Sequence, residues 1–228
     1  MENKKPSPLG KGNREAVDEV SAHGEGGTRR VTEEVLGHLS TFDEKREPSP
    51  LGKGDRNAVD EVFRKAVFFD RDGTLNVDIA YLHRPEDFIW IPGAKEAIKY
   101  VNDHGYLAIL VTNQSGVARG YYPERDVRHV YDWMNEELQS IGAHLDALYY
   151  CPHHPQGSVP AYTRTCNCRK PATGLIDEAC ARFHIDRTAS YFVGDRESDM
   201  LCARNAGLTG LRYDGGSLYD LVRAGISC

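Results

Sequence analysis

Two aspartates that follow a short apolar run constrain this chain more than any other feature. The run Ala66–Phe69 is rich in β-forming residues, which predicts a buried strand. Asp70 and Asp72 come next, and Gly73 then signals a turn. Since residues i and i+2 of a strand face the same side, both carboxylates can address one point beyond the strand's end. Open parallel sheets bind their ligands at that edge. One carboxylate could attack a phosphorus atom there while the other carries a proton.

The composition bounds the class of protein. A length of 228 residues is enough for one α/β domain with an appendage. The net charge of −6 offers no basic footprint for nucleic acid. No apolar run approaches the roughly 18 residues of a membrane span, and residues 1–30 lack the apolar core of a signal peptide. We therefore expect a cytoplasmic protein without nucleic-acid or membrane partners.

Residues 1–62 do not resemble part of a packed domain. Their only aromatic residue is Phe42, so burial of large apolar groups cannot offset the entropy lost on ordering them. The segment also contains a duplication, because Pro6–Gly12 recurs as Pro48–Gly54. We expect a disordered extension, and the sharper alternative is a repeated DNA element translated upstream of the true start. The folded domain is predicted to span residues 63–228.

Predicted strands and helices alternate along that domain. Strands are expected at residues 66–69, 106–111, 147–150, 190–193 and 210–213. Helices are expected between Gly93 and Gly105, from Pro123 to Gly142, at Gly174–Phe183, around Met200–Ala206, and from Ser217. Such alternation predicts an α/β fold, in which a Rossmann-like parallel sheet is covered by helices on both faces. Apolar residues at helical spacing, among them Ile141, are expected to belong to the core, as are Cys180 and Cys202.

Polar residues suited to phosphate chemistry follow four of the predicted strands. They are Asp70 and Asp72, then Thr112, Asn113, Gln114 and Ser115, then Arg169 and Lys170, and finally Asp195, Arg196 and Asp199. On one edge of a parallel sheet they place carboxylates for a hard cation beside a hydroxyl and a cation for a phosphoryl group. The carboxylates and a phosphoryl dianion repel one another, and magnesium with Lys170 would neutralise that charge.

A second cluster combines three thiols with an imidazole after the third strand, and consists of Cys151, His153, Cys166 and Cys168. Four soft ligands in two close pairs suit tetrahedral zinc. A reducing compartment also favours metal binding over disulfides. The zinc would be structural and would pin a long loop whose end carries Lys170. Four unligated loop residues are the plainer alternative, and His154 could replace His153.

The motifs resemble those of the haloacid dehalogenase (HAD) superfamily of phosphatases, which has Asp-x-Asp-Gly-Thr, a strand-end threonine, a lysine and Gly-Asp-x-x-x-Asp in this order. The resemblance implies that Asp70 is the nucleophile that becomes an aspartyl phosphate. Asp72 would be the general acid for the leaving oxygen and then the base for water. Thr112 and Lys170 would hold the phosphoryl oxygens. The implied magnesium ligands are the Asp70 carboxylate, the Asp72 backbone carbonyl and Asp195, with Asp199 as outer-shell support.

The segments around the second cluster narrow the resemblance. Residues 149–158 and 166–171 resemble the D-glycero-D-manno-heptose-1,7-bisphosphate 7-phosphatases, as does most of the chain from Ala66 to Ala206. The resemblance implies hydrolysis of the C7 phosphate of this small sugar phosphate, a step toward lipopolysaccharide. Histidinol-phosphate phosphatases share the motifs and rank second, because their loop is shorter than the 14 residues between Cys151 and Cys166. An inactive zinc-binding module is the remote alternative.

The same resemblance implies a set of substrate-binding residues. Those lining the sugar site would be Asp78, Tyr81, Thr112, Asn113, Gln114 and Ser115. Arg169 would bind the retained phosphate, since its planar fork suits phosphate oxygens, and Arg196 would lie beside the metal and the transferred phosphate. Ile79-Ala80 departs from the small or polar pair expected before Tyr81. No segment between the motifs has room for a large cap domain, and we expect a monomer.

Overall fold

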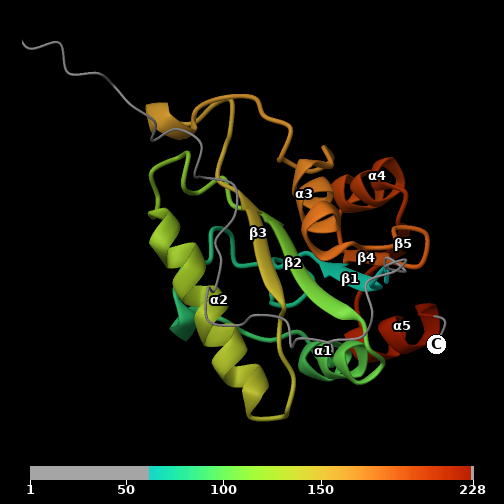
Figure 1. Ribbon diagram of the computed structural model, residues 1–228. Coiled ribbons are helices and arrows are strands. Elements are labelled where there is room, and N and C mark those ends of the chain that lie inside the picture. The colour runs from blue at the N-terminus through green and yellow to red at the C-terminus, as the bar shows by residue number, and fades with distance from the viewer. Residues whose placement is uncertain (1–61, 227–228) are drawn as a thin grey trace, which may run out of the picture. The chain divides into compact units, whose positions relative to one another are not determined.

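A computed structural model describes residues 62–226, so the duplicated N-terminal segment lies outside the described residues and the domain boundary at residue 63 stays a prediction. Within residues 62–226, five parallel strands form one sheet in the order β3-β2-β1-β4-β5. They are β1 (Ala66–Phe69), β2 (Leu107–Asn113), β3 (Ala147–Cys151), β4 (Tyr191–Gly194) and β5 (Thr209–Arg212) (Figure 1). The predicted parallel sheet is confirmed.

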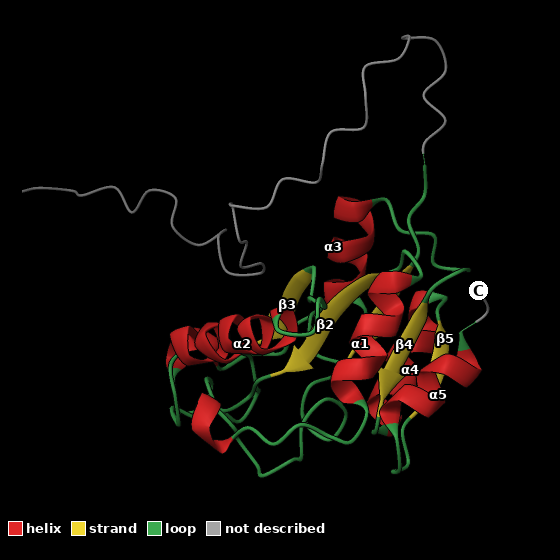
Figure 2. Ribbon diagram, turned by 90° about the horizontal axis from the view of Figure 1, so that it is seen from below, coloured by secondary structure: helices red, strands yellow, loops and turns green. Residues whose placement is uncertain are grey.

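Two layers of α-helices cover the sheet (Figure 2). Helices α1 (Ala94–Asp103), α2 (Glu124–Gln139) and α5 (Leu218–Gly225) pack on one face, and α3 (Gly174–Phe183) and α4 (Glu197–Ala206) pack on the other. Side chains of β1 alternate between the layers, since Val67 and Phe69 join the first core while Ala66 and Phe68 join the second. This alternation explains why the strand is apolar at every position. No helix in this part of the chain is long and apolar enough to cross a membrane.

Most predicted element boundaries agree with the structure, with two informative differences. Helix α4 begins at Glu197 rather than near Met200, because the Asp199 carboxylate accepts a hydrogen bond from the Arg196 backbone N–H (3.0 Å) and caps the first turn. The prediction for Ile141 was wrong. Helix α2 ends at Gln139, so helical spacing no longer places Ile141 on the buried face, and it is 37% exposed. Cys180 and Cys202 are buried, as predicted.

The position of β1 brings the strand ends together. Phe69, its last residue, is in register with Leu110 of β2 on one side and with Val193 of β4 on the other. The Asp70 backbone N–H then donates to the Val193 carbonyl at 2.9 Å. Because the chain continues from β1 to β2 and β3 on one side, and later to β4 and β5 on the other, the strand order reverses at β1. Ligands of doubly wound sheets bind at such a reversal.

Candidate active site

A buried lysine lies between two buried aspartates beyond the end of β1. Lys170 Nζ is 2.8 Å from Asp70 Oδ1 and 2.8 Å from Asp199 Oδ1, and it donates to the Val111 carbonyl at 3.0 Å. Burial raises the pKa of Asp70 to about 6, although the Lys170 ammonium opposes this shift. Burial also acts to lower the pKa of Lys170, but the two carboxylates outweigh it and raise that pKa. The lysine therefore stays charged beside Asp70.

The turn after β1 allows a third carboxylate to approach. Gly73 has φ +87°, and a Cβ built on it would lie 2.4 Å from Asp195 Oδ2. The Thr74 hydroxyl donates to Asp195 Oδ1 at 3.4 Å. Burial raises the pKa of Asp195 as well, despite the nearby Arg196 guanidinium. Only glycine at position 73 accommodates both the left-handed backbone and the neighbouring carboxylate.

These carboxylates fit a divalent cation. Oxygen atoms of Asp70, Asp195 and Asp199 all lie within 4.8 Å of one another, and an all-oxygen donor set is the type that magnesium prefers. The raised pKa values of Asp70 and Asp195 mark charge that the protein alone compensates poorly. Asp199 is already engaged by Lys170 and by the Arg196 backbone N–H, which suits an outer-shell role. The Asp72 backbone carbonyl stays a predicted ligand.

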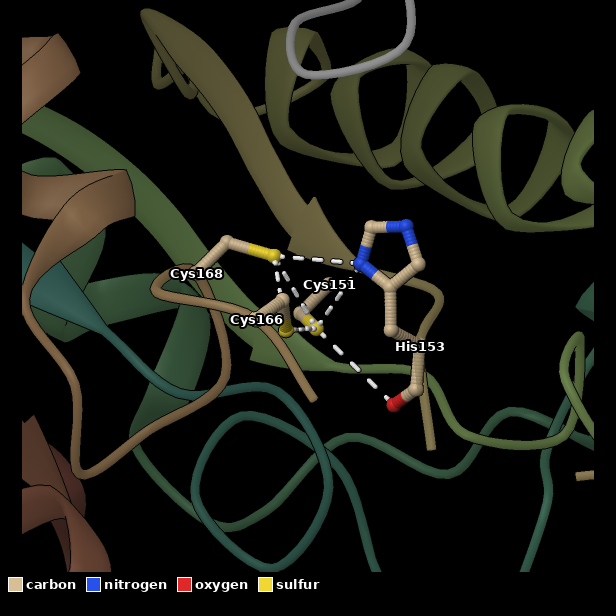
Figure 3. A group of neighbouring side chains, drawn as sticks. All are labelled: Cys151, His153, Cys166 and Cys168. Atoms are coloured by element: carbon tan, nitrogen blue, oxygen red, sulfur yellow. Dashed lines mark hydrogen bonds between the residues drawn. The ribbon is translucent and has the colours of Figure 1, made fainter. Parts of the chain in front are cut away.

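The predicted cysteine–histidine cluster comes together at the end of β3, whose last residue is Cys151 (Figure 3). The three sulfur atoms are 3.3 to 3.5 Å apart, and His153 Nδ1 lies 3.3 Å from Cys168 Sγ. Ligands about 2.3 Å from a tetrahedral zinc would be roughly 3.8 Å from one another, whereas a disulfide requires a sulfur separation of about 2.05 Å. The described cysteines are free thiols. The four side chains could therefore hold a zinc ion.

Proton sharing within this cluster also suits a metal. The hydrogen bond between the Cys151 and Cys168 thiols is the main reason why the pKa of Cys168 falls to about 5 and that of Cys151 rises. Thiolates are the form that binds metals, so a lowered thiol pKa favours a metal ligand. His153 is 2% exposed and lies in the cluster. His154 instead faces Arg119, with Nε2 3.2 Å from the Arg119 Nη2 atom. The structure therefore favours His153 over His154 as the ligand.

The segment that leaves the cluster delivers Lys170 to the sheet edge. The Asn113 side chain at the end of β2 accepts from the Lys170 backbone N–H (3.1 Å) and donates to the Lys170 carbonyl (3.2 Å). Arg169 donates to the His153 carbonyl at 3.4 Å. The Lys170 backbone is thus held by Asn113 at the end of β2. The Arg169 side chain is held by the His153 carbonyl in the cysteine–histidine cluster.

A cavity of about 430 Å³ opens above these groups. Its lining includes Asp70 and Asp72 together with every predicted substrate-binding residue: Asp78, Tyr81, Thr112, Asn113, Gln114, Ser115, Arg169, Lys170 and Arg196. Two of these lining residues, Asp78 and Arg196, form an ion pair of 2.6 Å. The structure thus brings the predicted catalytic and substrate-binding residues to one place.

Sequence reasoning missed several residues of this site. Arg119, Tyr122 and His154 also line the cavity, and a buried Arg71 contacts Asp72. A basic or aromatic side chain in a loop has no distinguishing pattern, so only the spatial arrangement identifies these residues. His154 carried a partial signal because it adjoins the Cys-x-His pair.

Comparison with known proteins agrees with this geometry. Residues 167–220 match the family model described as HAD-hydrolase-like. The chain is 47% identical over 146 residues to D-glycero-beta-D-manno-heptose-1,7-bisphosphate 7-phosphatase of Haemophilus ducreyi, covering 64% of this chain and 80% of that protein. It is 42% identical over 160 residues to the protein of the same name from Rhodopseudomonas palustris, covering 70% of this chain and 89% of that one.

A solved structure also matches the fold. D,D-heptose 1,7-bisphosphate phosphatase from B. bronchiseptica, complexed with magnesium and phosphate, has a TM-score of 0.60 and 31% identity, covering 71% of this chain and 87% of that chain. Sequence identity of this level over most of each relative's length is a relationship of family and not only of fold. The chain therefore belongs to the HAD-like family, and it is a phosphoric monoester hydrolase.

Proposed function

We propose that this protein hydrolyses the C7 phosphate of D-glycero-β-D-manno-heptose 1,7-bisphosphate to give heptose 1-phosphate and phosphate. The observation that carries the proposal is the 47% identity to a relative named for this activity. The cavity supports it with cationic groups for two phosphates, because Lys170 lies beside Asp70 and the lining also includes Arg169 and Arg119. The β-anomer is proposed because the curated relatives are named for it.

Asp70 and Asp72 would divide the chemistry. An Asp70 carboxylate oxygen attacks phosphorus, and the bond between phosphorus and the oxygen on C7 breaks with its electron pair moving to that oxygen. Asp72, as a carboxylic acid, gives its proton to that oxygen. A water molecule then attacks the phosphorus of the aspartyl phosphate and gives a proton to Asp72. Breakage of the acyl phosphate P–O bond regenerates the Asp70 carboxylate and releases phosphate.

Other residues of the site would bind and orient. Lys170 and the Thr112 hydroxyl would contact the phosphoryl oxygens. The two hydrogen bonds between the Asn113 side chain and the Lys170 backbone would keep the ammonium in place. Magnesium, held by Asp70, Asp195 and the Asp72 carbonyl, would supply positive charge that offsets repulsion between carboxylate and phosphate. A structural zinc on the cysteine–histidine cluster would support the segment that carries Arg169.

Recognition of the sugar would use the groups on the cavity wall. Arg169 would hold the retained C1 phosphate, while Asp78, Tyr81 and Ser115 would face the sugar hydroxyls and Arg196 would lie near the transferred phosphate. The Gln114 amide is instead occupied by protein groups. We further propose a cytoplasmic monomer.

Steady-state phosphate release with magnesium tests the proposal. The substrates are both anomers of heptose 1,7-bisphosphate and histidinol phosphate. We expect kcat/KM for the β-anomer to exceed that for histidinol phosphate by about a hundredfold, or about 2.7 kcal/mol of transition-state discrimination. Asp70→Asn should abolish release, whereas the matched surface variant Asp103→Asn, which removes an exposed pair with Lys99, should not.

Two outcomes would contradict the proposal in different ways. A preference for histidinol phosphate would retain the phosphatase chemistry and overturn the proposed substrate. Undiminished release by Asp70→Asn would overturn the assignment of the nucleophile, because an amide cannot form the acyl phosphate.

A further inference from the structure

A buried arginine, Arg71, donates several hydrogen bonds to the proposed general acid, Asp72. Arg71 is 1% exposed, although it lies between the two reactive aspartates. Its Nε and Nη2 atoms donate to Asp72 Oδ1 at 3.2 and 3.0 Å, and Nη2 also donates to Asp72 Oδ2 at 2.9 Å. A further bond of 2.7 Å runs from Nη2 to the Leu82 carbonyl. Burying a guanidinium costs several kcal/mol unless it is well paired, so this side chain is committed to Asp72.

The Arg71 guanidinium does not use all of its hydrogen-bond donors. Within residues 62–226, its buried Nη1 atom has no hydrogen-bond partner. The guanidinium meets the Asp72 carboxylate with its Nε and Nη2 edge, and this two-donor contact restricts the orientation of the carboxylate.

Gln114 holds the same carboxylate from another direction. It is 1% exposed, and its Nε2 atom donates to Asp72 Oδ2 and to Thr112 Oγ1, both at 3.0 Å. Its Oε1 atom accepts from the Tyr122 hydroxyl at 2.7 Å and from Arg71 Nη2 at 3.3 Å. Both ends of the amide are therefore occupied by protein groups. This contrasts with the substrate-binding role that the sequence resemblance implied for Gln114.

These contacts leave Asp72 facing the cavity in one orientation. Its side chain is 19% exposed and lines the cavity, while Asn76 Nδ2 adds a further donor to Oδ1 at 3.2 Å. Proton transfer to a leaving oxygen requires the two heavy atoms to meet at hydrogen-bond distance, and small misplacements reduce rates strongly. A free aspartate would rotate about its side-chain torsions, and the donors around Asp72 prevent this.

We propose that Arg71 and Gln114 are positioning residues that aim the Asp72 carboxyl group at the leaving oxygen and tie it to the phosphate-binding Thr112. The inference rests on the proposed function. In the assisted step, the Asp70 oxygen bonds to phosphorus, the P–O bond to the leaving group breaks, and the Asp72 proton moves to the departing oxygen. A sugar alkoxide needs that proton, whereas p-nitrophenolate is stable without it. Loss of the Asp72 orientation should therefore lower kcat/KM for the sugar phosphate much more than for the aryl phosphate.

The experiment compares kcat/KM for heptose 1,7-bisphosphate and for p-nitrophenyl phosphate, which reports the first chemical step for both. Arg71→Lys keeps the charge and removes the fork. We expect it to lower kcat/KM for the sugar phosphate by about a hundredfold and that for the aryl phosphate by less than about threefold. In an Asp72→Asn background, Arg71→Lys should have almost no further effect on the sugar substrate, because it acts through Asp72.

Tyr122→Phe provides a milder variant in case Arg71→Lys does not fold. It removes one hydrogen bond to Gln114, so we expect a loss of about fivefold on the sugar phosphate and little change on the aryl phosphate. The matched control is Tyr131→Phe, which removes the hydroxyl bond to the Leu145 carbonyl away from the cavity and should affect neither substrate.

Equal losses on both substrates, or an undiminished Arg71→Lys effect in the Asp72→Asn background, would overturn this inference and leave the proposed function standing. If the wild-type protein released phosphate from neither substrate, both the proposed function and this inference would be overturned.

Discussion

At the scale of single residues, Gly73 satisfies a backbone and a steric requirement together. Its φ of +87° is left-handed, and a Cβ would collide with the Asp195 carboxylate. We predict that Gly73→Ala lowers the free energy of unfolding by about 1 to 2 kcal/mol and raises the magnesium concentration for half-maximal activity by about tenfold or more, because a proposed ligand must move. Urea unfolding and magnesium titration of phosphate release measure the two effects.

Gly105 supplies the matched control for Gly73. It has φ +75°, but nothing lies within 4 Å of the position of its Cβ. Gly105→Ala should therefore share the backbone cost of about 1 kcal/mol and leave the magnesium requirement unchanged. Equal magnesium requirements in the two alanine variants would contradict the assignment of Asp195 as a ligand.

At the scale of elements, the segment from β3 to α3 connects the cysteine–histidine cluster with the reactive centre. Cys168 is a member of the cluster, and Lys170, two residues later, contacts Asp70. We predict that Cys168→Ala removes bound zinc and lowers kcat by about tenfold or more, because the support for Lys170 is lost. Elemental analysis and phosphate release measure these changes, and hydrogen exchange of residues 152–170 should become faster.

Cys180 is the matched control for this element. It is also a buried free thiol, but it lies in α3 outside the cluster. Cys180→Ala should keep one zinc per chain and near-native activity. Full activity of a zinc-free Cys168→Ala protein would refute the supporting role of the metal.

At the scale of the whole molecule, the buried carboxylates couple stability to pH and magnesium. The folded-state pKa of Asp70, about 6, lies above the ordinary value of 3.8, so the folded protein retains this proton longer than the unfolded chain. Stability of the magnesium-free protein should therefore fall as pH rises through the window between those values, compared with Asp70→Asn. Under the proposed function, magnesium would bind the ionised carboxylates, so it should restore stability mainly above that window.

Thermal unfolding tests this coupling. We expect 5 mM magnesium, roughly 100 times an assumed Kd, to raise Tm by about 5 °C at pH 7.5 and much less at pH 5. Asp70→Asn should show little magnesium shift at either pH. Identical shifts of the wild-type protein at both pH values would argue against metal binding through these carboxylates.

Many residues of the site were predictable because each follows a strand. Asp70 and Asp195 directly follow β1 and β4, and Thr112 lies at the carboxyl end of β2, so the parallel strands bring all three to one edge of the sheet. The cysteine–histidine pairs were predictable from ligand type and spacing. Ile141 was not, because helical periodicity continues in the sequence beyond the point where α2 ends.

Short-range patterns were enough to predict the parallel α/β fold, the edge of the sheet where the site lies, and the residue types for phosphate and metal chemistry. No such pattern predicted that Arg71 and Gln114 turn inward to hold Asp72, which is evident from the three-dimensional structure. For His153, which the sequence already favoured over His154, the structure agrees, because His153 lies in the cysteine–histidine cluster and His154 faces Arg119. An arginine in a loop is ordinarily solvated, and its burial here depends on the Leu82 carbonyl and on Gln114, the residue after β2. Such choices depend on long-range packing, which local patterns do not encode.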